Sequence, residues 1–180
     1  MTSQSIERRT TQLVGLTSML RHGFTLIEVI MVVLILGIAA AVVVPMASSA
    51  GSIQIRAGAS MVAADLEYAK SMAISRGQAY SVEFSTANET YRVLDHNNVE
   101  IPHPVKKGFN YVIDFKNDGR LDRVKIDNVN FGGKLTFDYL GTPYNSAGAP
   151  LAAAATVVLR SGDITKNVNV EPVTGFISIN

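Results

Sequence analysis

One long apolar run dominates the hydrophobic pattern of the chain. Between Phe24 and Val44, Thr25 and Glu28 are the only polar residues. As an α-helix that rises 1.5 Å per residue, the run would span about 30 Å, the thickness of a bilayer core. It therefore predicts a transmembrane helix over residues 24–44. A secretory signal peptide is the alternative, because the small residues at 46–50 could serve as its cleavage site.

A second helical pattern follows this run. Apolar residues recur at spacings of four and three, which places them on one face of a helix. They are Ile55, Ala59, Val62, Leu66, Ala69 and Ala73. Asp65 falls outside this stripe, and Gly77 after Arg76 is typical of a helix end. We therefore expect one helix from Phe24 to about Arg76, with an amphipathic half over residues 45–77.

Beyond Gly77 the hydrophobic period changes to two. Apolar residues alternate with polar ones at 80–84 and 91–93, on either side of a turn-rich segment, which predicts a β-hairpin. Further strands are expected at 124–129, 135–137, 156–159, 168–170 and 176–179. Residues 141–155 are rich in glycine, serine and alanine and should form a surface loop. The fold class is then α+β, with a long N-terminal helix packed on an antiparallel β-sheet of residues 78–180.

Composition and charge restrict the possible functions. A length of 180 residues suits one globular domain with an additional element. The absence of cysteine excludes disulfides and thiolate metal sites. Residues 1–22 carry three arginines and one glutamate, so the rest of the chain is close to neutral. A basic segment before an apolar run is typical of membrane targeting, and it predicts a cytoplasmic N terminus with the remainder outside.

Glu28 is the one charged residue in the apolar run. A carboxylate deep in a bilayer costs about 2.5–3.5 kcal/mol, and such residues usually have a partner and a role. Glu28 could instead lie near the lipid headgroups and reach water. Cleavage after Gly23 would create an ammonium group on Phe24, one helical turn from Glu28 and on the same face. Charge and countercharge would then appear together at the start of the helix.

The segment Gly23-Phe24-Thr25-Leu26-Ile27-Glu28 resembles the processing motif of type IV prepilins and type II secretion pseudopilins. The resemblance implies that residues 1–23 are a prepilin leader, which a prepilin peptidase removes between Gly23 and Phe24. It also implies N-methylation of Phe24. Glu28 would neutralise the N terminus of a neighbouring subunit during assembly. Pro45 stands at the end of the apolar run, where the family often has a proline.

The predicted leader is longer than many in that family, and Met19 offers a second possible start. A chain that begins there has a short basic leader. We expect a chain without residues 1–18 still to be cleaved after Gly23, because the motif itself is retained. The intact mass of the protein from membranes checks this, and an uncleaved product would contradict it.

Segments of the body resemble H-type minor pseudopilins and the related minor pilin T. The similar segments are residues 61–77, 135–141 and 168–177. The resemblance implies a structural subunit of the type II secretion pseudopilus that supports protein secretion across the outer membrane. A minor type IV pilin for pilus assembly or DNA uptake is the alternative, and a signal-anchored periplasmic binding domain without a filament is a third.

The resemblance also implies partners and a location. The expected partners are other pseudopilins in the filament, the prepilin peptidase and the bacterial inner membrane, with secreted proteins as further candidates. The chain would cross the inner membrane once, with its C-terminal domain in the periplasm, before it assembles into a pseudopilus. No cofactor is expected.

The sequence does not indicate catalysis. His96 and His103 lie in expected loops, where solvent-facing side chains are the rule, and no nucleophile motif accompanies them. The acidic segment from Asp114 to Asp122 departs from a calcium-loop pattern, because Lys116 and Lys125 occupy two of the ligand positions. We expect a polar turn there, no bound metal and no enzyme activity.

Nucleic-acid binding is not supported either. Phosphate contacts need a cluster of cations. Beyond Lys125 the chain has only the scattered cations Lys134, Arg160 and Lys166, and Lys106-Lys107 is an isolated pair.

Overall fold

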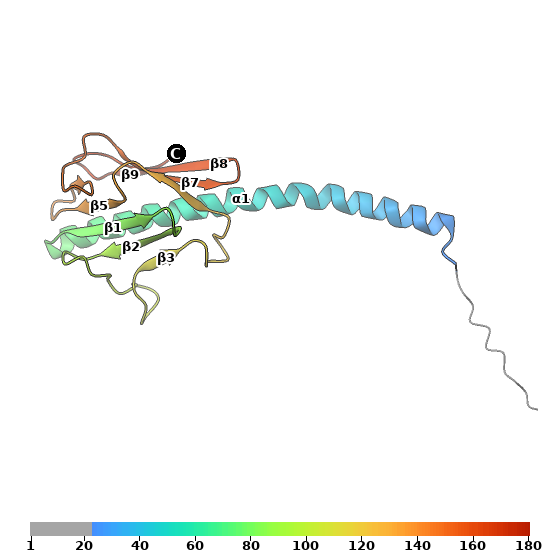
Figure 1. Cartoon of the computed structure of the whole chain (residues 1–180), viewed down its shortest axis with the longest axis horizontal. Helices are drawn as coiled ribbons and strands as arrows, with labels where there is room; N and C mark the ends of the chain where they lie inside the picture. Colours follow the sequence, from blue (N-terminus) through green and yellow to red (C-terminus); the bar gives the residue numbers. More distant parts are fainter. Residues whose placement is uncertain (1–22) are drawn as a thin grey trace, which may run out of the picture. The chain divides into compact units, whose positions relative to one another are not determined.

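The structure is a computed structural model that describes residues 23–180, with the backbone alone for residues 42–50. The expected leader, including Met19, lies outside the described residues apart from Gly23. Helix α1 (Leu26–Arg76) is the only helix longer than a turn among the described residues (Figure 1). The chain divides into two units between Ala41 and Val42, and each unit is described by itself.

In the first unit, α1 presents apolar side chains on all sides. Leu26 is 80% exposed and Val32, the least exposed of its large apolar residues, is still 48% exposed. The segment therefore has no polar face, in contrast to an ordinary surface helix. Within the described part of the chain, no helix reaches the length and apolarity required to cross a membrane.

In the second unit, α1 carries the predicted apolar stripe. All six stripe residues, from Ile55 to Ala73, are fully buried, so this prediction is confirmed. The helix ends at Arg76, where Gly77 adopts a φ of +64° that favours glycine, and the Gln78 N–H donates to the Ala73 carbonyl over 3.2 Å.

The strands form two antiparallel sheets instead of the single sheet expected. The first sheet has the order β3-β2-β1-β5-β6 and the second β4-β7-β8-β9. The first contains β1 (Tyr80–Ser85), β2 (Thr90–Leu94), β3 (Val112–Asp114), β5 (Lys134–Phe137) and β6 (Pro143–Tyr144). The second contains β4 (Lys125–Val129), β7 (Ala155–Ser161), β8 (Ile164–Val170) and β9 (Ile177–Ile179).

The predicted hairpin and the five further predicted strands are confirmed. Strands β3 and β6 were not predicted, and β6 lies inside the segment expected to be a loop. They have three and two residues, which is too short for an alternating pattern to be visible in the sequence.

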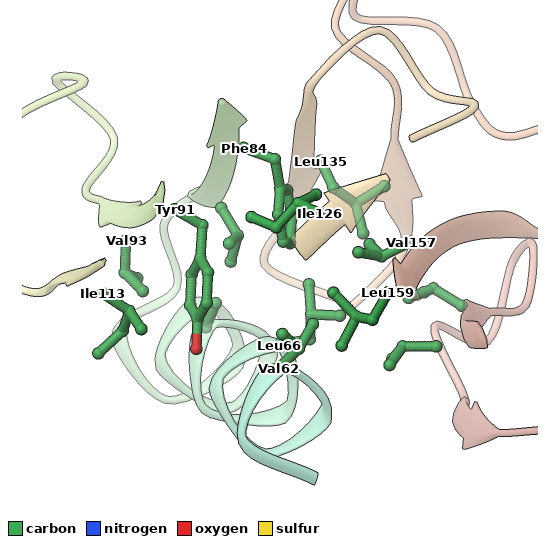
Figure 2. Packing of buried hydrophobic residues seen from close by; sticks show 14 of the residues in the cluster. Val62, Leu66, Phe84, Tyr91, Val93, Ile113, Ile126, Leu135, Val157 and Leu159 are labelled. Carbon is green, nitrogen blue, oxygen red and sulfur yellow. The ribbon is translucent and has the colours of Figure 1, made fainter. Parts of the chain in front are cut away.

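A single hydrophobic core joins the helix to both sheets. Figure 2 shows Val62 and Leu66 of α1 below side chains from both sheets, among them Tyr91 and Leu159. Glu89, in the turn between β1 and β2, connects the two sheets directly. Its carbonyl accepts the Phe115 N–H over 3.0 Å, and its carboxylate accepts the Ile126 N–H over 2.6 Å.

Candidate functional site

Thr25 determines where α1 begins. Its carbonyl accepts the backbone N–H groups of Glu28 and Val29 over 3.1 and 3.2 Å, and its hydroxyl accepts the Glu28 N–H over 3.3 Å. This is N-capping, in which a threonine oxygen satisfies an amide that has no partner within the helix. The cap leaves Gly23 and Phe24 outside the helix.

The Gly23–Phe24 peptide bond is accordingly exposed and non-helical. Phe24 is 80% exposed, and no atom outside its chain neighbours lies within 4 Å of a Cβ built at Gly23. A peptidase needs an accessible backbone that is not held in a helix. The cap therefore presents the predicted cleavage bond in a suitable form immediately before the helix.

Glu28 lies in the first turn of α1 and is exposed. A negative charge at this position interacts favourably with the positive end of the helix dipole. Phe24 precedes the helix, so the expected position on the same helical face as Glu28 does not apply in this structure. Pro45 lies within α1, and its side chain is outside the described part of the chain.

A buried carboxylate is the main polar feature of the second unit. Asp65 is only 8% exposed, although it lies outside the apolar stripe. It accepts the Tyr91 hydroxyl over 2.5 Å and the Tyr111 hydroxyl over 2.7 Å. Asp65 of α1 is thus hydrogen-bonded to β2 and to the segment before β3.

Burial controls the ionisation of this cluster. Desolvation raises the pKa of Asp65, and the two tyrosine hydroxyls partly oppose that effect. Burial and the neighbouring carboxylate raise the pKa values of Tyr91 and Tyr111, so both phenols stay protonated and remain donors. The cluster is a fully paired buried network, which suits a structural role.

His103 extends the cluster towards the surface. Its ring stacks on Tyr111 with centroids 4.6 Å apart, and its Nδ1 accepts the N–H groups of Val105 and Lys106, each over 3.1 Å. His103 lies in a loop, as expected, and is half-buried, while His96 is exposed. Desolvation and the nearby Lys106 lower the pKa of His103. A groove of about 630 Å³ lies beside these residues.

The acidic segment after β3 forms local turns. The Asp114 carboxylate accepts the backbone N–H and the side-chain amide of Asn117 over 3.0 and 2.6 Å. Asp118 forms an ion pair with Arg120 at 2.7 Å, and that contact lowers the pKa of Asp118 to about 2. No group of three acidic or histidine side chains suited to a metal ion occurs among the described residues.

Two of the three cations beyond Lys125 have partners within the chain. Arg160 pairs with Asp127 at 2.8 Å, and Lys134 donates to the Asn98 side chain. These contacts occupy cationic groups that a nucleic acid would otherwise use.

Sequence reasoning missed the Asp65 cluster, although one signal was present. Asp65 directly precedes the buried stripe residue Leu66, and buried tyrosine hydroxyls usually require a hydrogen-bond partner. The tyrosines lie 26 and 46 residues further along the chain, so no local pattern connects them to the helix.

Comparison with solved structures gives pilin-like neighbours. The minor pseudopilin EpsH from the type 2 secretion system of Vibrio cholerae is similar with a TM-score of 0.51 and 12% identity, over 71% of this chain and 96% of that one. The type IV minor pilin FimU from Pseudomonas aeruginosa is similar with a TM-score of 0.50 and 17% identity, over 72% of this chain and 90% of that one. At these identities the likeness shows the fold. Comparison with curated protein sequences gives no match.

Family comparison agrees with both ends of this description. The prokaryotic N-terminal methylation motif matches residues 18–44, which contain the capped helix start. The type II transport protein GspH family matches residues 58–174, which include α1 from Gly58 onward and most of both sheets. Since this match covers more than half of the sequence, the chain belongs to the type II transport protein GspH family.

Proposed function

We propose that the protein is a minor pseudopilin, a structural subunit of the type II secretion pseudopilus that supports protein secretion across the outer membrane. The observation that supports this most is the helix start. An exposed Gly23–Phe24 bond directly precedes a capped helix, and the part of this helix in the first unit is apolar on all sides. The paired polar network of the second unit supports a structural role and not a catalytic one.

In this proposal the subunit is first processed in the membrane and then assembled into the filament. A prepilin peptidase removes the leader after Gly23 and Phe24 is N-methylated, while residues 24–44 anchor the chain once in the inner membrane with residues 78–180 in the periplasm. The apolar segment then leaves the lipid and packs with other pseudopilins in the filament. Burial of its side chains against other subunits replaces burial in lipid, and Glu28 provides the charge contact that sets the register.

A minor type IV pilin for pilus assembly or DNA uptake is the second candidate function. The similarity to FimU, which is of the same order as that to EpsH, favours it.

A secretome comparison between the parent strain and a clean deletion of the gene tests the first function against the second. Transformation frequency and twitching are scored in the same strains. Exoproteins that stall in the periplasm while DNA uptake stays normal support the pseudopilin. Normal secretion with reduced DNA uptake or twitching supports the pilus subunit instead.

Replacement of Gly23 with valine is expected to slow leader removal by about a hundredfold, the order that a displaced reacting bond costs. A branched side chain next to the cleaved bond restricts the backbone that the peptidase must hold. Pulse–chase labelling with intact-mass analysis measures the rate.

Gly37→Val is the matched control, because a Cβ built at Gly37 also has no atom within 4 Å outside the helix's own backbone. Gly37 lies 14 residues beyond the cleavage bond. Cleavage of Gly23→Val at the normal rate, or equal slowing in both variants, would contradict the role of Gly23.

A further inference from the structure

Five large apolar side chains gather where α1 ends, and we call them the α1-terminal patch. They are Ile74, Tyr139, Leu140, Val173 and Phe176, and each is 52–75% exposed. They come from the last turns of α1, the β5–β6 turn and the β8–β9 turn. Exposed apolar residues that occur singly need no explanation, whereas a group from three segments usually marks an interaction surface.

Close packing holds the three segments together. A Cβ at Gly141 would lie 3.0 Å from Ile74 Cδ1, and one at Gly175 would lie 2.5 Å from the Gly141 carbonyl oxygen. Both glycines have positive φ, +84° and +57°, which glycine adopts without strain. Lys70 of α1 donates from Nζ to the Gly175 carbonyl over 3.0 Å. The patch is therefore built into the fold.

Val173 is held in a strained conformation within this patch. Its φ is +66°, which is unfavourable for a β-branched residue, and its side chain is 75% exposed. The Thr174 N–H donates to the Pro172 carbonyl over 2.7 Å, which closes a tight turn around Val173. A turn of this geometry is rare and strained.

Nothing in the fold requires valine at this position, because the exposed side chain contributes no core packing. Asparagine or glycine would form the same turn with less strain. A strained residue with an exposed apolar side chain points to a function, and a contact outside the chain would use that side chain.

The size of the patch limits the type of partner. Five side chains of this exposure present on the order of 500 Å² of apolar surface, less than the roughly 800 Å² per partner of a stable independent interface. Such a contact is effective when a second attachment already holds the two partners together. This chain has a second association surface of that kind, the exposed apolar helix from Leu26 to Ile38.

We propose that the α1-terminal patch is the docking site for the globular domain of a second pilin-like subunit within the same filament. This inference rests on the proposed function. The helix of the first unit supplies most of the association energy, and the patch fixes which neighbour sits at the end of α1. A weak, specific contact added to a strong, general one selects the neighbour without preventing release from the membrane.

Val173→Asn tests the proposal, because it should affect stability and docking in opposite directions. Relief of the strain is expected to raise the Tm of the full chain in detergent by about 2–4 °C. Loss of the apolar contact is expected to lower docking about tenfold. Val105→Asn is the matched control, since Val105 is 82% exposed but lies on the loop beside Tyr111. It should lower neither quantity.

Docking is measured by site-specific photo-crosslinking in cells. A photoreactive amino acid replaces Leu140 in the patch, and Val33 of the apolar helix in a second strain, with partners identified by mass spectrometry. An adduct at Leu140 with a protein that carries the prepilin methylation motif, weakened by Val173→Asn, supports the proposal. No adduct, or one with a protein without the motif, overturns it.

The Val33 strain separates the two proposals. If Val33 gives pilin-like adducts and Leu140 gives none, the docking site is wrong and the filament function stands. If neither position gives a pilin-like adduct, both are wrong. Equal Leu140 adducts with and without Val173→Asn would overturn the role of the strained residue.

Discussion

Replacement of Asp65 with alanine is expected to lower the free energy of unfolding by about 3 kcal/mol, since each buried hydroxyl left without an acceptor costs about 1–3 kcal/mol. Asp65 accepts hydrogen bonds from the hydroxyls of both Tyr91 and Tyr111, which are 1% and 4% exposed. The variant removes this acceptor from two hydroxyls that water cannot readily reach. Thermal unfolding of the full chain in detergent should show a Tm lower by about 6–12 °C.

Asp65→Asn provides the matched control for this effect. The amide keeps an oxygen acceptor for one hydroxyl and can donate to the other, so its cost should be clearly smaller than that of alanine. A Tyr91→Phe, Tyr111→Phe double variant should make the alanine substitution much less costly, because the hydroxyls that lost their acceptor are then absent. Equal losses for alanine and asparagine would show that the network is not the cause.

Comparison of the wild-type chain with Asp65→Asn reveals how the ionisation of Asp65 makes stability depend on pH. Burial raises the pKa of Asp65 in the folded chain above the ordinary value of 3.8. The folded state therefore holds a proton that the unfolded state has already lost. This contribution is complete below the ordinary pKa and disappears as the pH rises through the raised value. Relative to Asp65→Asn, the wild-type chain should lose stability over that window, and a constant difference would contradict the buried carboxylate.

Replacement of Glu28 with leucine is expected to abolish most filament assembly while insertion and cleavage continue. The structure places Glu28 in the first turn of an apolar helix, where leucine fits a lipid environment better. The variant removes the only carboxylate that can pair with the new N terminus within the apolar run. Without it, the charge on Phe24 would be buried in the filament without a partner, which costs about 3–5 kcal/mol per contact.

Two measurements separate assembly from the earlier steps. Intact mass reports cleavage and methylation. The amount of the protein in the sheared filament fraction reports incorporation, and for Glu28→Leu it should fall more than tenfold. Glu28→Gln keeps the shape and removes the charge, so it should resemble leucine if charge is the cause. Normal assembly of either variant would refute the role of Glu28, whereas uncleaved protein would place Glu28 in processing instead.

Local patterns predicted much of the fold because their physical cause is local. The stripe from Ile55 to Ala73 has a helical period since one face of α1 is buried, and the hairpin of β1 and β2 alternates for the same reason. The division into two sheets depends on pairings between distant segments. β5 adds to β1, while β4 pairs with β7, and hydrophobicity alone does not distinguish these partners.

Only part of the candidate site could be predicted from the sequence. The processing motif is contiguous, so its residues could be named from the sequence, and Thr25 places them at the helix start. The burial of Asp65 and the stacking of His103 could not be predicted, because polar residues are mostly exposed and neither contact has a local signal. Both contacts depend on tyrosine partners that are distant in the sequence. Strain at Val173 could not be predicted either, since valine gives no local signal of a positive φ.

The link through Glu89 has a mechanical consequence. Glu89 forms hydrogen bonds both with Phe115, directly after β3, and with Ile126 of β4, and the stripe of α1 packs on both sheets. A pull transmitted along the second half of α1 would therefore be shared by the two sheets, because neither sheet can move separately from the other without breaking the bonds at Glu89. Under tension the domain should therefore unfold in a single step, and the two sheets should not detach one after the other.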